Sequence, residues 1–293
     1  MYAIKTEGLT KFYGKARGIV QLDMAVEEGD FFGFIGPNGA GKSTTIRTLL
    51  GLIKATSGSA EIFGMDIAKQ RTQILSQVGY LPSETTFYSG MRVKNILQLS
   101  ADLRKTDCRE ESARLCQRLE LDVNRRVEEL SLGNRKKVGI VCALQHRPRL
   151  YIMDEPTSGL DPLMQREFYS ILKERNAEGA TVFLSSHILS EVQHYCSHAA
   201  VIREGRLLTC DSVDRLGHTD ARRVTLRGVQ TLPALENVVD VKRQPDGISF
   251  LYSGDPNTLL GTLAQMSLRD ITITEPDLEE IFLHYYEKED GQK

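Results

Sequence analysis

The sequence predicts an α/β protein in which a parallel sheet is covered on both faces, followed by a smaller α+β segment. Three observations support this prediction. Continuous apolar runs, typical of strands buried on both faces, occur in FFGFI (31–35), LYIMD (150–154) and TVFLS (181–185). A long stretch of helical periodicity, from Val93 to about Arg147, separates the first run from the other two. After His218, short alternating segments joined by turns replace both patterns.

Composition limits the kinds of protein this can be. The 293 residues suffice for one large domain or two ordinary ones, and a net charge of −2 gives no reason to expect binding to nucleic acid or to an anionic membrane. The five cysteines form no Cys-x-x-Cys pair, and the N-terminal MYAIKTEG lacks the apolar run of a signal peptide. No segment approaches the run of about 20 apolar residues that spans a bilayer. We therefore expect a cytoplasmic chain in a reducing compartment, with any membrane role supplied through a partner.

Residues 2–35 are expected to form strands. Leu22, Met24 and Val26 alternate with polar residues, as in a half-buried strand, and Glu28-Gly29-Asp30 predicts a turn. Tyr13 falls in the expected loop between the first two strands. An aromatic ring at that place could stack on adenine, and the alternative is an ordinary surface tyrosine.

The stretch GPNGAGKST follows the first buried strand directly. It fits the P-loop pattern G-x-x-x-x-G-K-[ST] at Gly36, Gly41, Lys42 and Ser43. Glycines let the backbone turn tightly and present successive N–H groups to phosphate oxygens, while the helix that begins at Lys42 directs its positive end at the same anion. Lys42 is expected to reach the β and γ phosphates, and the Ser43 hydroxyl to bind Mg²⁺. A glycine-rich turn that binds nothing gives no reason for a lysine and a hydroxyl at these two positions.

A helical insertion is expected within the α/β core. The elements that lead to it are a helix at about 43–53, a strand pair in GSAEIFGMDI, a short helix at about 69–77 and the strand VGYL (78–81). Apolar residues then recur at helical spacing with charged residues between them, as at Val93, Ile96 and Leu97. The pattern predicts a helical subdomain at about 84–147.

Two adjacent acids end the strand LYIMD. Asp154 lies at the carboxyl edge of the expected sheet, next to the P-loop, where a carboxylate can hold Mg²⁺ directly or through water. Because neighbouring side chains on a strand point in opposite directions, Asp154 and Glu155 can have different tasks only where the strand is ending. The alternative, an acidic pair in a solvated loop, disagrees with the apolar run before them.

The chain from Pro162 to about residue 215 is expected to complete the first domain. The predicted elements are a helix that stops at Gly179, the strand TVFLS, a helix containing Leu189, Val192 and Cys196, and a hairpin made of AAVIR and RLLTC around Glu204-Gly205. His194, Cys196 and His198 could suggest metal ligands, but they cross a helix end and need not converge, so no metal is expected there.

The pattern restarts around Leu216-Gly217-His218. RRVTLRG, VVDVKRQ, ISFLYSG and RDITIT predict four strands, with Pro245-Asp246-Gly247 as a hairpin turn. A helix is expected at about 256–266, and the helix DLEEIFLHYYEKE follows the last strand. This predicts an α/β domain at 1–215 and a small α+β domain at 216–293, the second without any group of residues suited to catalysis.

Four further segments follow the P-loop in order: LSLGN (130–134), MDEP (153–156), SGLD (158–161) and SSH (185–187). Together with the P-loop they resemble the nucleotide-binding subunit of ATP-binding-cassette (ABC) transporters, over about residues 2–215. No other P-loop group combines the LSxG segment with a histidine after the following strand. The resemblance implies a RecA-like P-loop NTPase core with an antiparallel β subdomain and an inserted helical subdomain.

The resemblance also implies roles for single residues. Glu155 would be the general base that polarises the attacking water, His187 would bridge the γ-phosphate and Glu155, and Lys42 would act with them. A lone histidine after a strand is more often structural, so the role of His187 depends on its context. ATP and Mg²⁺ are the implied cofactors, with Mg²⁺ on Ser43 and Asp154. The implied nucleotide-binding residues are Tyr13, Gly36, Asn38, Gly39, Ala40, Gly41, Lys42, Ser43, Thr44, Ser131, Gly133 and Asp161.

The LSLGN segment caps a helix of the insertion and cannot act on its own chain's nucleotide. In the resembled family this segment faces a second protomer, where the Ser131 hydroxyl, the Gly133 N–H and the helix N-terminus contact the γ-phosphate in trans. The implied partners are therefore a second ATPase cassette, either a copy or a paralogue, and a transmembrane permease. They place the chain at the inner face of the cell membrane, and no nucleic acid is expected.

The chain departs from the family pattern in two segments. Leu132 and Asn134 replace the glycine and glutamine of the usual LSGGQ, while both phosphate-contacting positions remain. After GYLP, where the family has a glutamine in the lid, the chain has Ser83 followed by Glu84. Serine is too short to reach Mg²⁺ and the water directly. An ordered water or Glu84 substitutes for the glutamine, or the coupling is looser.

The expected function is an ATPase subunit that dimerises on ATP and drives a separate permease. The stretch Phe87–Met91 would lie beside the groove where permease loops dock in the family, and EPDLEEIFLHYY resembles the ATPase subunits of ABC-2 exporters, including antibiotic and multidrug exporters. A soluble ABC ATPase acting on ribosomes or DNA is the alternative, disfavoured because the chain has one cassette and no long coiled-coil insertion. A P-loop small-molecule kinase would lack LSLG and the SSH histidine. The transported substrate is not indicated.

Overall fold

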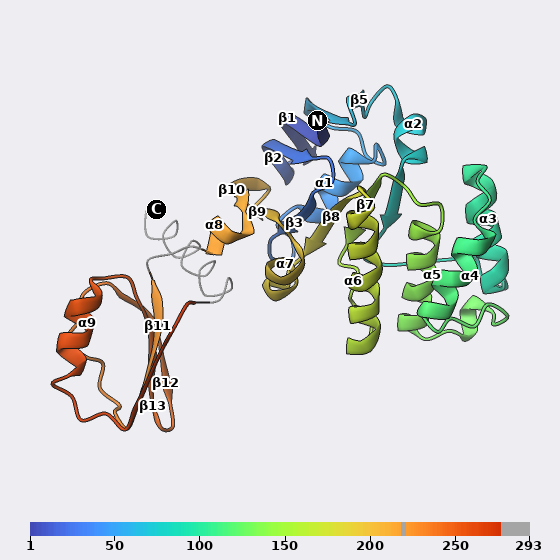
Figure 1. Cartoon of the computed structure of the whole chain (residues 1–293). Helices are drawn as coiled ribbons and strands as arrows, with labels where there is room; N and C mark the ends of the chain where they lie inside the picture. Colours follow the sequence, from blue (N-terminus) through green and yellow to red (C-terminus); the bar gives the residue numbers. More distant parts are fainter. Residues whose placement is uncertain (218–220, 277–293) are drawn as a thin grey trace. The chain divides into compact units, whose positions relative to one another are not determined.

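In the computed structural model, which describes residues 1–217 and 221–276, the chain divides into two units, Met1–Ser212 and Val213–Lys293 (Figure 1). The first unit contains two sheets and the second contains one. The predicted helix DLEEIFLHYYEKE lies outside the described residues. Along the described ranges, none of the helices has the length and apolar character of a membrane span.

A six-stranded sheet with the order β10-β9-β3-β8-β7-β6 forms the centre of the first unit. Its strands are β3 (Phe31–Ile35), β6 (Val78–Leu81), β7 (Leu150–Asp154), β8 (Thr181–Ser186), β9 (His198–Arg203) and β10 (Arg206–Ser212). All neighbours are parallel except β10, which forms the predicted hairpin with β9. Every residue of β3, β7 and β8 is buried, which confirms the three apolar runs as central strands. Because β8 lies between β3 and β7, Asp154 approaches the P-loop across one intervening strand.

An antiparallel sheet with the order β2-β1-β4-β5 covers one face of the central sheet. Its strands are β1 (Tyr2–Tyr13), β2 (Ala16–Glu27), β4 (Ser57–Ile62) and β5 (Met65–Asp66). Tyr13 pairs with Ala16 and ends β1, so its predicted position in a loop is wrong: the hairpin turn is only two residues long and the strand extends up to it. The core between the two sheets includes Leu22, Phe34 and Ile46.

Helices of the first unit flank these sheets: α1 (Lys42–Leu49), α2 (Arg71–Ser76), α6 (Pro162–Ala177) and α7 (Leu189–Tyr195). Helix α8 (Val213–Gly217) begins the second unit. Helix α1 supplies Ile46 to the core and is shorter than predicted. Helix α7 packs closely on the other face, since a Cβ built on Gly33 of β3 would lie 2.5 Å from Val192 Cγ1. The central sheet is therefore covered on both faces, as the sequence predicts.

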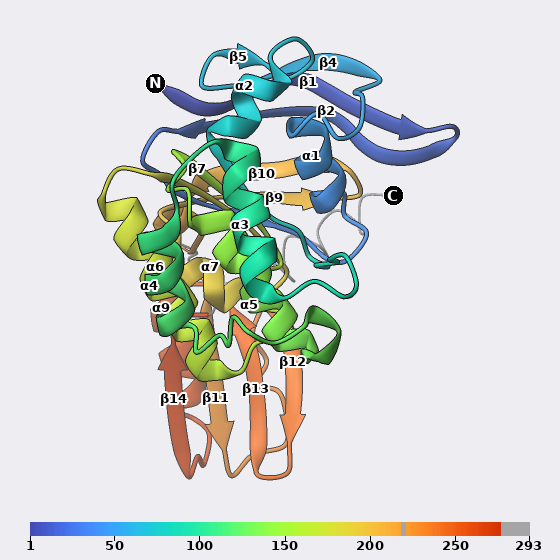
Figure 2. The same ribbon diagram turned by 90° about the vertical axis from the view of Figure 1, so that its right-hand side faces the viewer.

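The predicted helical insertion consists of α3 (Val93–Arg104), α4 (Arg109–Arg118), a 3₁₀ turn η1 (Val127–Glu129) and α5 (Leu132–Leu144) (Figure 2). Two arginines tie α4 to α6: Arg118 pairs with Glu174 at 2.6 Å, and Arg175 pairs with Glu111. Helix α5 packs on β6, where a Cβ on Gly79 would lie 2.2 Å from the Ala143 carbonyl oxygen. The insertion is thus joined to the core through both α4 and α5.

The second unit contains an antiparallel sheet with the order β12-β13-β11-β14. Its elements are β11 (Arg222–Arg227), β12 (Val238–Gln244), β13 (Gly247–Tyr252), α9 (Pro256–Leu263) and β14 (Asp270–Thr274). Val224, Phe250 and Leu259 lie in its core. Gln244 pairs with Gly247, so the hairpin turn predicted at this place is present.

Candidate active site

The loop Gly36–Gly41 connects the end of β3 to α1 in a conformation that requires glycine. The φ angles of Gly39 and Gly41 are +81° and +109°, a region that side chains disfavour. A Cβ on Gly36 would lie 2.3 Å from the carbonyl oxygen of Ile202, so no larger residue fits there. The first N–H groups of a helix have no partner within the helix, and here they begin at Lys42. The loop and the start of α1 therefore form an anion-binding site.

The carboxylate of Glu155 is the point where two other predicted residues meet. Lys42 Nζ lies 3.2 Å from Glu155 Oε1, and His187 Nδ1 lies 2.5 Å from Glu155 Oε2. Lys42 is 5% exposed and Glu155 17%, whereas His187 is 47% exposed, so the histidine lies on the solvent side of the carboxylate. Lys42 also donates to the Gly36 carbonyl at 2.6 Å. These contacts connect the P-loop, the end of β7 and the end of β8.

The backbone of Glu155 adopts a left-handed conformation, with φ +49°, which is uncommon outside glycine. Its N–H donates to the Ser185 carbonyl at 3.0 Å, and its own carbonyl accepts from Lys136 at 3.0 Å. This turn ends the strand after Asp154, so the two adjacent acids lie in different surroundings: the side chain of Asp154 is buried and that of Glu155 is partly open to solvent.

The carboxylate of Asp154 is suited to a divalent cation. It is 1% exposed, and neither of its oxygens has a hydrogen-bond partner. A buried carboxylate without partners is costly, and oxygen ligands of this kind are those that Mg²⁺ prefers. The Asp154 carboxylate therefore fits a magnesium ion at the end of β7.

Tyr13 lies beside the start of α1. A Cβ on Gly18 would lie 3.2 Å from Tyr13 Cε2 and 3.0 Å from Thr44 Cγ2. Gly18 therefore lies between the Tyr13 ring and the first turn of α1. The ring is 46% exposed, and Lys11 Nζ lies 5.2 Å from its centre. An exposed ring at this place is accessible for stacking.

Three predicted nucleotide ligands lie apart from this group. Ser131 is the N-cap of α5 and accepts a hydrogen bond from Asn134 N at 3.3 Å, next to Leu132, which is 65% exposed. Gly133 packs closely on Gly159, since a Cβ there would lie 2.5 Å from the Gly159 carbonyl oxygen. Asp161 caps α6, accepting from Leu163 N and Met164 N. Within the described residues, no hydrogen bond or ion pair joins these three to Lys42, Glu155 or His187.

Two contributors were missed from the sequence. The N–H of Gly205, in the turn between β9 and β10, donates to the Ala40 carbonyl at 2.8 Å and so helps to hold the phosphate loop in place. Lys136 donates to the Glu155 carbonyl and also to Ser83 of the lid, at 2.9 Å. Neither residue had a signal in the sequence. Gly205 occurs in an ordinary hairpin turn, and nothing in the sequence distinguishes Lys136 from an exposed lysine such as Lys94.

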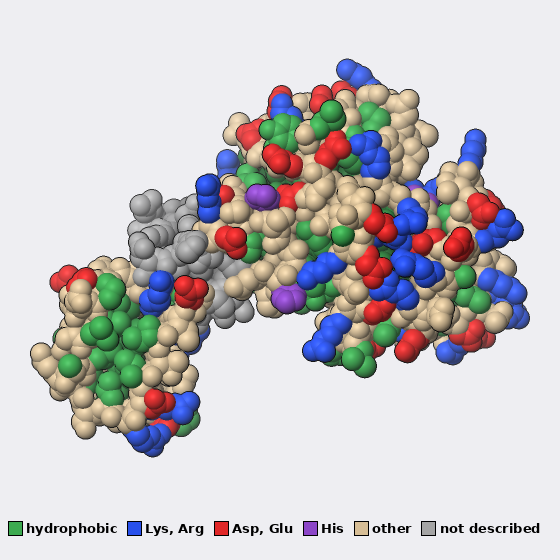
Figure 3. Space-filling view, in the orientation of Figure 1, with side chains coloured by type: hydrophobic (Ala, Val, Ile, Leu, Met, Phe, Trp, Pro, Cys, Tyr) green, Lys and Arg blue, Asp and Glu red, His purple; other side chains and the backbone are tan. Residues whose placement is uncertain are grey.

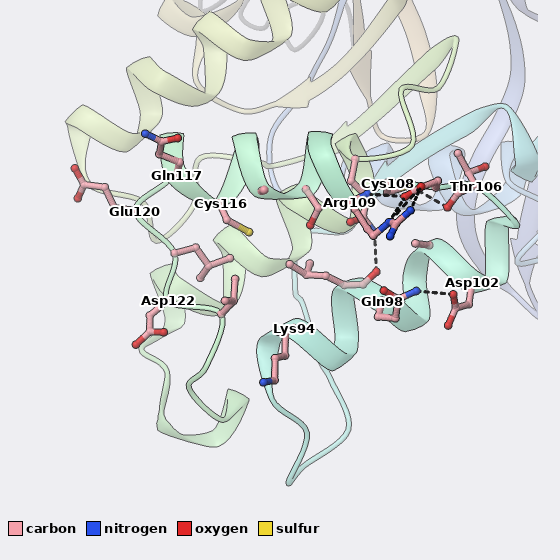
Figure 4. A pocket seen from close by; sticks show the side chains of 18 of the residues that line it. Lys94, Gln98, Asp102, Thr106, Cys108, Arg109, Cys116, Gln117, Glu120 and Asp122 are labelled. Carbon is pink, nitrogen blue, oxygen red and sulfur yellow. Dashed lines mark hydrogen bonds and ion pairs between the residues drawn. The ribbon is translucent and has the colours of Figure 1, made fainter.

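A separate cavity of about 1030 Å³ lies between α3 and α4 (Figure 4). Leu97, Ala101 and Cys116 line its apolar part, and charged side chains such as Lys94 and Asp102 line its edge. It shares no lining residue with the phosphate loop or with the ends of β7 and β8. The described residues also contain no cluster of His, Cys, Asp and Glu that could hold a metal ion.

Comparisons with known proteins agree with this geometry. A family model described as "ABC transporter" matches residues 19–158. The chain is 36% identical to the bacitracin transport ATP-binding protein BcrA of Bacillus licheniformis, over 96% of each chain. It is 28% identical to the linearmycin resistance ATP-binding protein LnrL of Bacillus subtilis, over 96% of this chain and 97% of the other. A solved structure of the ATP-binding subunit of an ABC transporter aligns with a TM-score of 0.69 at 30% identity, covering 73% of this chain and 91% of that one.

Proposed function

The chain belongs to the ABC transporter family as an ATP-binding subunit with ATPase activity, and from this premise we propose that it pairs head to tail with a second cassette on ATP and drives a membrane permease. The observation that carries the proposal is the convergence of Lys42 and His187 on Glu155, beside a phosphate-binding loop. A lysine, a general base and a histidine that orients the base are the groups that hydrolysis of a phosphoanhydride requires.

In the proposed mechanism, the phosphates of ATP lie against the backbone from Gly36 to Thr44. Tyr13 stacks on adenine, and Lys42 turns from the Gly36 carbonyl to the β and γ phosphates, which are stronger acceptors. Glu155 takes the proton of the attacking water, and His187 holds the carboxylate in place through Oε2. Mg²⁺, when bound on Ser43 and Asp154, neutralises the charge that develops on the phosphates.

The second cassette completes the site. Ser131 and Gly133 stand at the N-terminus of α5 beside the exposed Leu132, where a nucleotide held by another protomer can reach them. Their contact with the γ-phosphate in trans would make ATP part of the interface, so that hydrolysis separates the pair. Asp161 caps the N-terminus of α6, at the end of the loop that follows β7. Its carboxylate would contact the nucleotide at the edge of this interface.

A groove of about 1020 Å³ supports docking of a permease. Apolar and aromatic side chains from β6, the lid and α3 line it, among them Tyr80, Phe87, Tyr88, Leu99 and Leu103. Tyr88 and Leu103 are each 77% exposed, and contiguous exposed apolar surface is typical of interaction sites. A permease segment in this groove would hold the chain at the inner face of the cell membrane.

The relatives named for bacitracin transport and linearmycin resistance favour export of an antibiotic-like compound. We propose the cassette domain at 1–215 and the α+β domain at 216–293 as the two parts of this subunit. Co-purification of the full chain with a multi-span membrane protein would support the permease partner, whereas recovery with ribosomes would contradict it.

The decisive variant is Glu155→Gln, which keeps the shape of the side chain and removes the base. We expect it to bind ATP with unchanged affinity and to form a stable ATP-bound dimer, measured by size-exclusion chromatography with light scattering. Lys42→Ala is the matched variant that loses nucleotide binding and stays monomeric. Hydrolysis by Glu155→Gln at the wild-type rate would remove Glu155 from its proposed role.

A further inference from the structure

Lys136, in the second turn of α5, is a buried cation that joins three backbone segments. Its side chain is 2% exposed. Its ammonium donates to the carbonyl oxygens of Pro82 at 3.1 Å, Ser83 at 2.9 Å and Glu155 at 3.0 Å. Pro82 and Ser83 form the start of the lid after β6, and Glu155 follows β7. One side chain thus links the LSLGN helix, the lid and the catalytic strand end.

This arrangement differs from a lysine packed by chance. An ammonium has three N–H donors, and the three carbonyls engage all of them. Burial lowers the pKa of Lys136 to about 8, against the opposing effect of the nearby carboxylates of Asp154 and Glu155. Burying an ammonium has a desolvation cost, which its three hydrogen bonds offset, and removing them would leave these three carbonyls without this donor.

Helix α5 also packs closely on the lid and on the end of β6. A Cβ on Gly139, one turn after Lys136, would lie 2.6 Å from Thr85 Cγ2 and 3.0 Å from Leu81 Cδ1. Among the described residues, the backbone of Glu155, which has a left-handed conformation, makes two hydrogen bonds: its N–H donates to the Ser185 carbonyl and its own carbonyl accepts from Lys136. A shift of α5 therefore acts on the backbone of Glu155 through the Lys136 ammonium.

We propose that Lys136 is a positioning residue, which fixes the backbone of Glu155 to α5 and the lid so that the position of α5 sets the placement of the Glu155 carboxylate. The inference rests on the proposed function, because it takes Glu155 to act on the attacking water. Since Ser131 caps the N-terminus of α5, Lys136 would connect the contact made with the partner cassette's nucleotide to the base of the same chain. It would also supply the link between lid and base at a place where the lid has Ser83, whose side chain is short.

The test uses the full-length chain with Lys136→Met, which keeps the length of the side chain and removes its donors. A misplaced general base lowers turnover without weakening substrate binding, and misplacement of about 1 Å costs up to about 100-fold. We therefore expect kcat to fall by about 10- to 100-fold while KM and ATP affinity change less than about twofold. The matched control is Lys94→Met, which removes an exposed lysine of α3 and should leave kcat unchanged.

A double-variant cycle distinguishes positioning from general damage. If Lys136 acts through Glu155, then Lys136→Met should slow single-turnover hydrolysis by Glu155→Gln by less than about twofold, because the group that it positions is already gone. Amide exchange in residues 81–86 should also become faster in Lys136→Met. If Lys136→Met fails to bind ATP because it does not fold, Lys136→Gln is measured in the same way.

Two results would overturn the inference: kcat of the folded variant within about twofold of wild type, or effects of the two substitutions that multiply in the cycle. Either result leaves the proposed function intact as long as wild type hydrolyses ATP and Glu155→Gln retains only slow residual hydrolysis. If the wild-type chain neither binds nor hydrolyses ATP, the proposed function is itself contradicted.

Discussion

The ion pairs between α4 and α6 lead to a prediction about stability. Arg175 is 2% exposed and pairs with Glu111 of α4 and, at 2.9 Å, with Glu178, the residue that follows α6 (Figure 3 shows basic and acidic side chains interleaved over this region). Glu111 is 14% exposed and Glu178 50%, so Glu111 is the better shielded partner. A guanidinium keeps its charge at any relevant pH and cannot escape burial by losing a proton. Glu111→Gln should therefore leave the buried guanidinium of Arg175 paired with one carboxylate, that of Glu178, in place of two.

The size of the effect follows from these contacts. A hydrogen bond to a charged group contributes about 1.5–3 kcal/mol, and breaking a buried pair completely costs about 3–5 kcal/mol. Because Glu178 remains and the Gln carbonyl still accepts a hydrogen bond, we expect a loss of about 2 kcal/mol in the free energy of unfolding. For a unit of this size that corresponds to about 4–8 °C in the unfolding midpoint.

Urea denaturation and calorimetry of the full chain measure this loss in the transition of the first unit. Asp107→Asn is the control, because it removes an exposed ion pair with Arg109 and should leave stability unchanged within error. Arg175→Met should cost less than Glu111→Gln, since it buries an apolar group and leaves Glu111 near Arg114, at 3.5 Å. A Glu111→Gln protein as stable as wild type would refute the reasoning.

Two further predictions concern acid and magnesium. Burial and, secondarily, Arg104 lower the pKa of His146 to about 4. Below about pH 6.5 the histidine is therefore protonated in the unfolded chain but still neutral in the folded chain. Because the unfolded state binds the additional proton, the free energy of unfolding should fall by about 1–2 kcal/mol by pH 5. Urea denaturation of His146→Asn at pH 7.5 and pH 5 should show that much less acid sensitivity, and equal sensitivity would exclude His146 as its source. Asp154→Asn should raise the Mg²⁺ concentration needed for half-maximal hydrolysis at least about tenfold, with nucleotide binding measured in EDTA unchanged. An unaltered Mg²⁺ requirement would count against Asp154 as a ligand.

The fold was predictable where a pattern of apolar residues close together in the sequence indicates which side chains are buried. Apolar runs over 31–35, 150–154 and 181–185 identify the central strands because a strand buried on both faces has no polar alternation. The P-loop was predictable because its backbone conformation requires glycine at Gly36 and Gly41 and its ligand requires Lys42. Element ends were less accurate: α1 ends at Leu49, and Tyr13 belongs to β1, because neighbouring chain segments decide how far each element extends.

The sequence by itself therefore determined the family-like set of segments and the identity of the loop that holds phosphate, since both depend on residues close together in the chain. The tertiary structure alone decided that β8 separates β3 from β7, that Lys42 and His187 share one carboxylate, and that Lys136 reaches both Ser83 and Glu155. The physical reason is that a sequence pattern shows whether a side chain is buried, whereas its partners depend on which distant segments pack against it. A buried lysine and a solvated one look alike until the chain has folded around them.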